Sequence, residues 1–86
     1  MLSQKVVVKN ETGIHARPAM LLINFVKKYK STITLVTKDR KANCASIIGV
    51  MALGVKYGVE IEVIADGEDE KIALPEVISF IEILKG

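Results

Sequence analysis

Two segments in which apolar and polar residues alternate constrain the fold more than any other feature of this sequence. Residues 32–37 place threonines among apolar residues, and residues 59–65 read Val-Glu-Ile-Glu-Val-Ile-Ala. Successive side chains of a strand point to opposite faces of its sheet, so each segment predicts a strand with one buried and one wetted face. In the second segment Val59, Ile61 and Val63 are expected to face inward. Such strands suit an antiparallel sheet that is covered on one side only.

Two shorter segments complete the predicted sheet. Gln4–Val8 is short and rich in β-branched residues, which is typical of a strand. Lys41–Cys44 returns after the polar turn at Lys38–Arg40, and we expect it to pair with residues 32–37 as a hairpin.

Helical spacing of apolar residues separates these strands. One helix is expected from about Ala16 to Lys28 or Tyr29, a short one over Ser46–Gly54, and a third that runs to the C-terminus. The residues expected to be buried on the first and third are Ala19, Leu22, Ile23, Val26, Leu74, Val77, Ile78, Ile81 and Leu84. The predicted class is therefore α+β: a two-layer open-faced sandwich, in which three helices cover one face of a four-stranded antiparallel sheet in the order βαββαβα.

Pro75 is the irregular feature of the last helix. The acidic segment at residues 66–70 favours a helix start, because carboxylates stabilise a helix N-terminus. A proline five or six residues further on removes a backbone hydrogen bond and crowds the previous turn. Two alternatives follow: a regular helix that starts nearer Leu74, or a helix that bends at Pro75.

Composition limits the classes of function. The chain has 86 residues, half of them apolar and 5% aromatic, with a formal net charge of +2. This length suits one domain over residues 1–86. The near balance of charge and the scarcity of aromatic residues argue against a nucleic-acid-binding domain. Residues 1–5 do not resemble a signal peptide and the apolar runs are too short to span a bilayer, so we expect a cytoplasmic protein without membrane insertion.

Cys44 is the only cysteine, which excludes an internal disulfide and fits a reducing compartment. We expect it to pack as a small apolar residue rather than to serve redox chemistry. One histidine and one cysteine do not make a cluster of metal ligands, and we expect no metal and no other cofactor.

The candidate functional residues lie in residues 12–20, which contain the only histidine, His15. Pro18 is tolerated in the first turn of a helix, so the helix should begin near Ala16 with His15 at or beside its N-cap. Such a terminus favours anions, and Arg17 adds a permanent cation suited to phosphate oxygens. Both disfavour imidazolium, which leaves a neutral, nucleophilic ring at pH 7. The residues suggest that His15 accepts a phosphoryl group, although a lone histidine is more often structural or solvated.

One face of the first helix is a candidate docking surface. Arg17, Met20, Asn24 and Lys27 recur at helical spacing, and they combine long cations with an adaptable apolar residue. Spacing alone allows a merely solvated face equally well.

The short helix is a second candidate surface. Ser46 precedes helical periodicity and is an N-cap candidate. The apolar residues after it are too many for one face of a short helix, so some must be exposed. We expect Ile47, Ile48 and Met51 to lie outward beside His15, where a partner protein could bind.

Two strings carry a family resemblance. The string Gly13–Ala19 reads Gly-Ile-His-Ala-Arg-Pro-Ala, and Ser46–Gly54 reads Ser-Ile-Ile-Gly-Val-Met-Ala-Leu-Gly. The first resembles the active-site motif of HPr, the histidine-containing phosphocarrier family of the bacterial sugar phosphotransferase system, and the second resembles that family's regulatory-serine region. The resemblance covers essentially the whole chain and implies the same α+β fold.

The resemblance implies a phosphoryl carrier rather than an enzyme. It implies that His15 receives a phosphoryl group on Nδ1 from Enzyme I, which is charged by phosphoenolpyruvate, and passes it to a sugar-specific Enzyme IIA domain. Arg17 is then expected to help hold the phosphate. We expect the carrier to be a monomer.

The resemblance also implies a regulatory role for Ser46. In Gram-positive members of the family the matching serine is phosphorylated by an ATP-dependent HPr kinase/phosphorylase, and the modified form binds a catabolite-control transcription regulator. The alternatives are a serine that only caps a helix, and a module that regulates through Ser46 alone; the presence of His15 argues against the second. Ala45, Met20 and Ile48 depart from the residues that the family often has at these positions.

Overall fold

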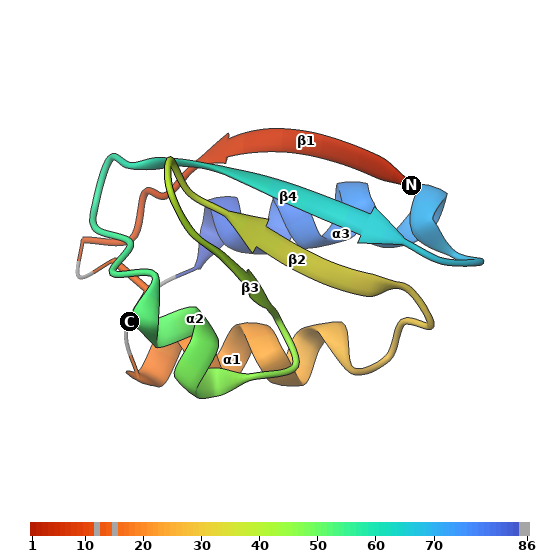
Figure 1. Cartoon of the computed structure of the whole chain (residues 1–86), viewed down its shortest axis with the longest axis horizontal. Coiled ribbons are helices and arrows are strands. Elements are labelled where there is room, and N and C mark those ends of the chain that lie inside the picture. Colours follow the sequence, from red (N-terminus) through yellow and green to blue (C-terminus); the bar gives the residue numbers. More distant parts are fainter. Residues whose placement is uncertain (12, 15, 85–86) are drawn as a thin grey trace.

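The computed structural model describes residues 1–11, 13–14 and 16–84, and its elements follow the predicted order (Figure 1). The bounds are β1 Leu2–Val7, α1 Ala16–Val26, β2 Thr32–Val36, β3 Lys41–Asn43, α2 Ile47–Ala52, β4 Glu60–Asp66 and α3 Glu70–Ile83. Helix α1 ends two or three residues earlier than expected, because the chain turns after Val26, whose carbonyl accepts the Tyr29 N–H at 3.1 Å.

The strands form one antiparallel sheet in the order β1-β4-β2-β3. The register pairs Val6 with Ile61 and Leu35 with Val63, so that these apolar residues share one face. The helices lie together on one side of the sheet and leave the other face open (Figure 1). The predicted open-faced α+β sandwich is confirmed.

The buried face of the sheet follows the alternation of the strands. Ile33, Leu35, Ile61 and Val63 are 0–2% exposed, as the alternating patterns predict. Val59 is the exception, because it is 37% exposed. It lies in a turn before β4, where its N–H donates to the Lys56 carbonyl at 3.2 Å, so strand alternation begins one residue later than expected.

Helices α1 and α3 supply the other half of the core. Phe25 of α1 stacks on Phe80 of α3 with ring centroids 4.2 Å apart. Every residue predicted to be buried on these helices is buried: Ala19, Leu22, Ile23, Val26, Leu74, Val77, Ile78, Ile81 and Leu84. Among the described residues, no helix combines the length and the apolar character needed to cross a membrane.

Helix α3 begins at Glu70 and continues through Pro75, so the alternative of a start near Leu74 is wrong. Asp69, the residue before α3, anchors the first turn of this helix to Lys30 and Ser31. The Asp69 carboxylate accepts the Lys30 N–H at 2.8 Å, the Ser31 N–H at 2.9 Å and the Ser31 hydroxyl at 2.5 Å. Pro75 lies on the exposed side of the helix, where water can bond the carbonyl that a proline leaves without its N–H partner.

Candidate functional site

The turn that precedes α1 is closed by the buried residue Asn10, which is 5% exposed. Its carbonyl accepts the Gly13 N–H at 2.9 Å, and its side-chain amide donates to the Gly13 carbonyl at 2.6 Å. A buried polar side chain is stable only when it is hydrogen-bonded, so these contacts fix the turn.

The same turn is docked on the segment that follows α2. The Ile14 N–H donates to the Val55 carbonyl at 2.9 Å, and the Ile14 side chain is 2% exposed. Gly13 has a φ of +71°, and a Cβ there would overlap the Val55 carbonyl and lie 2.8 Å from the Lys56 Cα. Glycine is therefore required both by the backbone conformation and by the close approach of the two segments.

His15 lies outside the described residues, as does Thr12. The residues on both sides of His15 are described. Ile14 is anchored in the core, and α1 starts at Ala16, which confirms the predicted start of the helix. The role of His15 as a phosphoryl acceptor stays a prediction.

The first turn of α1 favours an anion. Its leading N–H groups have no partner within the helix, and the helix dipole places partial positive charge there. The first turn contains no acidic residue, Arg17 is exposed and Pro18 is buried. The guanidinium of Arg17 is thus presented to solvent at the positive end of the helix.

The predicted stripe on α1 is exposed throughout. Met20 is 56% exposed, and Arg17, Asn24 and Lys27 are also exposed, with Lys27 one residue beyond the end of the helix. The adjacent Leu21 is 45% exposed, which the sequence did not indicate. Exposure agrees with either a docking surface or a solvated face, so the docking role stays a prediction.

Ser46 caps α2, as its position in the sequence predicts. Its backbone is extended, with φ −111° and ψ 111°, and its exposed side-chain oxygen accepts the Gly49 N–H at 3.0 Å. The cap explains why the short helix begins at Ile47.

The apolar residues of α2 divide between two faces. Ile48 is 79% exposed and Met51 is 41% exposed, as expected. Ile47 is half-buried and packs against the core, so the expectation that it lies outward is wrong. The reason is that Ile47 is three residues before the buried Val50, and this spacing puts both on the inner face.

Helices α1 and α2 pack against each other (Figure 1), which places their exposed apolar residues on neighbouring elements. We call Met20, Ile48 and Met51 the exposed apolar set. Exposed apolar side chains on adjacent elements are typical of a protein–protein contact.

Two residues that hold this region were not singled out in the sequence. Asn10 closes the turn before α1, and the spacing of Asn10 and Gly13 is a turn signal that could have indicated it. The Arg40 guanidinium donates to the carbonyl of Ala52, at the end of α2, at 2.9 Å. Nothing in the local sequence around Arg40 indicates that contact.

The thiol of Cys44 is 1% exposed, as expected for a residue that packs as a small apolar group. Burial raises its pKa to about 12, so the thiol stays protonated and unreactive at neutral pH.

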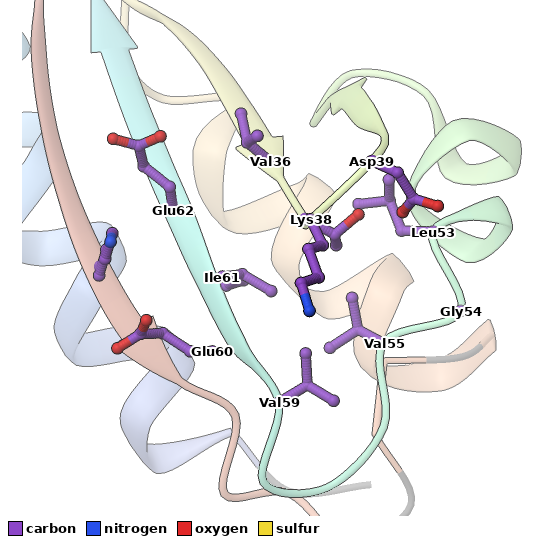
Figure 2. A pocket seen from close by; sticks show the side chains of 12 residues that line it. Val36, Lys38, Asp39, Leu53, Gly54, Val55, Val59, Glu60, Ile61 and Glu62 are labelled. Carbon is purple, nitrogen blue, oxygen red and sulfur yellow. The ribbon is translucent and has the colours of Figure 1, made fainter.

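A hollow of about 500 Å³ lies between the turn at 37–40, the segment after α2 and the start of β4 (Figure 2), and it shares Val55 with the docked turn. Lys38 extends across it toward Val55 and Val59, and Glu60 and Glu62 line its other side. Its described lining does not include any of the predicted site residues. A second hollow, of about 240 Å³, includes the predicted docking residue Lys27 in its lining.

Comparisons with known proteins identify the family of this chain. The family model described as "PTS HPr component phosphorylation site" matches residues 2–82. The HPr-like protein Crh of Bacillus subtilis (strain 168) is 39% identical over 82 residues, which are 95% of this chain and 96% of that protein.

Solved structures show the same fold. A phosphocarrier protein HPr from Bacillus anthracis str. Ames has a TM-score of 0.89 at 26% identity, with 94% of this chain and 96% of that chain covered. A crystal structure of Bacillus subtilis Crh, described as an intertwined dimer with a swapped domain, has a TM-score of 0.76 at 40% identity, with 94% and 93% covered. The family match over residues 2–82, the 39% identity to a full-length relative and the shared fold show that the chain belongs to the HPr family of the phosphotransferase system.

Proposed function

We propose that this chain is a phosphocarrier in which His15 accepts a phosphoryl group from Enzyme I and passes it to a sugar-specific Enzyme IIA domain. Enzyme I would take the group from phosphoenolpyruvate. Membership of the HPr family supports this class of function. The observation that carries the proposal is the pair of contacts that Asn10 makes with Gly13, together with the docking of Ile14 on Val55, just before the first turn of α1 and its exposed Arg17 in the sequence.

The chemistry needs a nucleophile and a site that stabilises negative charge without enclosing it. A ring nitrogen of His15 would form a bond to phosphorus while the bond to the Enzyme I donor breaks, and the reverse exchange with Enzyme IIA would regenerate the free imidazole. Arg17 and the leading N–H groups of α1 would stabilise the charged oxygens of the group in transit. An open surface suits this work, because two different proteins must reach the same atom in turn.

The exposed apolar set of Met20, Ile48 and Met51 supplies the contact area that such partners would use. Asn24 and Lys27 extend the surface along α1, and Lys27 adds a cation. We propose that Enzyme I and Enzyme IIA domains dock here. An acidic rim on the partner would complement Arg17 and Lys27.

The test is a reconstituted relay. Radiolabelled phosphoenolpyruvate, Enzyme I, this chain and an Enzyme IIA domain are mixed, and label on the Enzyme IIA domain is measured with and without the chain. The proposal predicts that label reaches Enzyme IIA only when the chain is present. A His15→Ala variant should block the relay while it keeps the fold, which circular dichroism checks. Relay through that variant would disprove the proposal.

We further propose that an HPr kinase/phosphorylase phosphorylates Ser46 with ATP, and that the modified form binds a catabolite-control transcription regulator. Two observations favour this role: Ser46 is exposed, and the 39% identical relative Crh is described as the Bacillus subtilis catabolite repression HPr. The test is incubation with ATP and the kinase, followed by mapping of the modified residue. Label on the wild type that Ser46→Ala abolishes supports the role, and an unlabelled wild type contradicts it.

A module that regulates only through Ser46 is the competing function. It predicts kinase-dependent label on Ser46 together with no transfer from phosphoenolpyruvate. The relay experiment therefore separates the two functions.

We propose that the carrier acts in the cytoplasm as a monomer. A monomer requires the pairing of β1 with β4 of the same chain, and this pairing is compatible with the fold. The swapped dimer described for Crh is the alternative state, and sedimentation at micromolar concentration distinguishes them.

A further inference from the structure

Helix α2 has six residues, which is too short for a helix to be stable by itself in water. The rest of the chain must therefore hold it in place. This matters for function, because α2 carries Ser46 at its start and Ile48 and Met51 on its exposed side.

The β2–β3 hairpin contacts α2 along its length. At the start, the Ser46 N–H donates to the Asn43 carbonyl at 3.0 Å, and the Ala45 N–H donates to the Asn43 side chain at 2.8 Å. In the middle, Gly49 lies close to β3, because a Cβ built on it would be 3.5 Å from the Cβ of Ala42. These contacts fix the first half of the helix on the hairpin.

Arg40 fixes the other end. Its guanidinium donates to the Ala52 carbonyl at 2.9 Å. The last carbonyls of a helix lack partners within the helix and carry partial negative charge, so a cationic donor is doubly suited to this place.

The backbone of Arg40 is itself anchored. Its carbonyl accepts the Thr37 N–H at 2.8 Å and the Thr37 hydroxyl at 3.2 Å, which closes the hairpin turn. The side chain therefore reaches α2 from a fixed point in the turn and joins two elements that are separate in the sequence.

We propose that Arg40 is a positioning residue for partner docking. By bonding the Ala52 carbonyl it holds the end of α2, and with it the exposed side chain of Met51, in the orientation that partners engage. The docking part of this inference rests on the proposed function, whereas the effect on α2 does not. Arg40 is not among the residues proposed to hold the transferred group, so its loss should weaken docking and leave the chemical step unchanged.

The first experiment measures amide hydrogen exchange in three variants. Arg40→Gln removes the charge and shortens the side chain, and Arg40→Lys keeps the charge but loses the forked donor. Lys41→Gln is the matched control, because it removes one cation from the next residue, which is exposed on β3. We expect Arg40→Gln to speed exchange of the Leu53 and Gly54 amides by about two- to tenfold, the factor that corresponds to one hydrogen bond. Arg40→Lys should lie between Arg40→Gln and the wild type.

The second experiment measures phosphoryl transfer from Enzyme I to the same variants. We expect Arg40→Gln to raise KM by a few-fold while kcat stays within error of the wild type, and Lys41→Gln to change KM less. A merely structural residue would not produce this split between KM and kcat.

The two experiments separate the possible outcomes. Exchange at Leu53 and Gly54 that is no faster in Arg40→Gln than in Lys41→Gln would overturn the inference. Faster exchange with an unchanged KM would overturn the docking role of Arg40. If even the wild type accepts no phosphoryl group, the proposed function fails, and the exchange experiment still decides whether Arg40 positions α2.

Discussion

Gly13 and Arg17 flank the proposed acceptor and contribute to it in different ways. Gly13 allows the turn before α1 to approach the Val55–Lys56 backbone, and its φ of +71° is in a region that favours glycine. Arg17 is exposed and provides a cation at the start of the helix. At the scale of single residues, one therefore shapes the site and the other gives it charge.

We predict that Gly13→Ala destabilises the fold and impairs phosphoryl transfer. A left-handed conformation costs a non-glycine residue about 1–2 kcal/mol, and the overlap with the Val55 carbonyl adds to that cost. Gly58→Ala is the matched control, because Gly58 has a φ of +83° but open space around its Cβ position. Urea unfolding should show a larger loss of free energy of unfolding for Gly13→Ala. Equal losses in the two variants would mean that the close approach does not matter.

We predict that Arg17→Ala slows transfer from Enzyme I by about 10- to 100-fold, the range that one hydrogen bond to a charged group corresponds to. The free energy of unfolding should change little, because the side chain is exposed. Lys27→Ala removes the same charge at the far end of the stripe and should slow transfer much less. If the two substitutions slow transfer equally, Arg17 contributes only its positive charge to the surface and no specific contact with the phosphoryl group.

At the scale of elements, the ends of the helices are fixed by residues distant in the sequence. Asp69 precedes α3 and binds Lys30 and Ser31 at the start of β2. Arg40 binds the end of α2 from the hairpin turn. Both contacts join a helix terminus to a strand connection, and this explains how helices with weak local signals are held at defined positions.

The Asp69 contacts predict a pH dependence of stability. The hydrogen bond from the Ser31 hydroxyl, followed by that from the Lys30 N–H, holds the pKa of Asp69 below its usual value of 3.8. A carboxylate with a lowered pKa in the folded state stabilises the fold above its ordinary pKa, and this stabilisation is lost as the pH falls through the lowered pKa. Asp69→Asn should therefore lower the melting temperature at pH 7, and the difference from the wild type should shrink below about pH 4.

The control for this prediction is Asp39→Asn, which changes an exposed carboxylate in the hairpin turn. Thermal unfolding followed by circular dichroism between pH 2 and pH 7 gives both profiles. A difference between Asp69→Asn and the wild type that stays constant over this range would show that the ionised carboxylate does not matter.

At the scale of the whole molecule, the order of elements and the composition of the core could be predicted from the sequence. Alternation places one face of a strand in the core, and helical spacing does the same for α1 and α3. These patterns are local, so they can be read without knowledge of the partner element. The start of α1 was also predictable, because Pro18 limits where a helix can begin.

The errors at Val59 and Ile47, the question left open at Pro75 and the missed contact of Arg40 all concern features that depend on contacts between elements. Val59 precedes residues that alternate as in a strand, but it lies in the turn before β4. Ile47 belongs to the inner face of α2 because it aligns with Val50. Pro75 does not delay α3, since Asp69 and Ser31 anchor the first turn from outside the helix. The contact of Arg40 with Ala52 likewise has no local signal.

Different parts of the molecular surface carry the exposed apolar residues and the hollow. The exposed apolar set lies on the helix layer beside the start of α1, whereas the hollow lined by Lys38 and Val59 lies between the hairpin turn and β4 (Figures 1 and 2). Partner contacts would thus gather on the part of the molecule that α1 and α2 form.

The central claim is that a single imidazole, at the start of α1, carries the phosphoryl group. The most direct measurement is intact-protein and peptide mass spectrometry after incubation with phosphoenolpyruvate and Enzyme I. The account predicts one added phosphoryl group on the peptide that contains His15, stable in alkali and lost in acid, as expected for a phosphoramidate. A phosphoryl group on any other residue, or no modification of a folded chain by active Enzyme I, would contradict it.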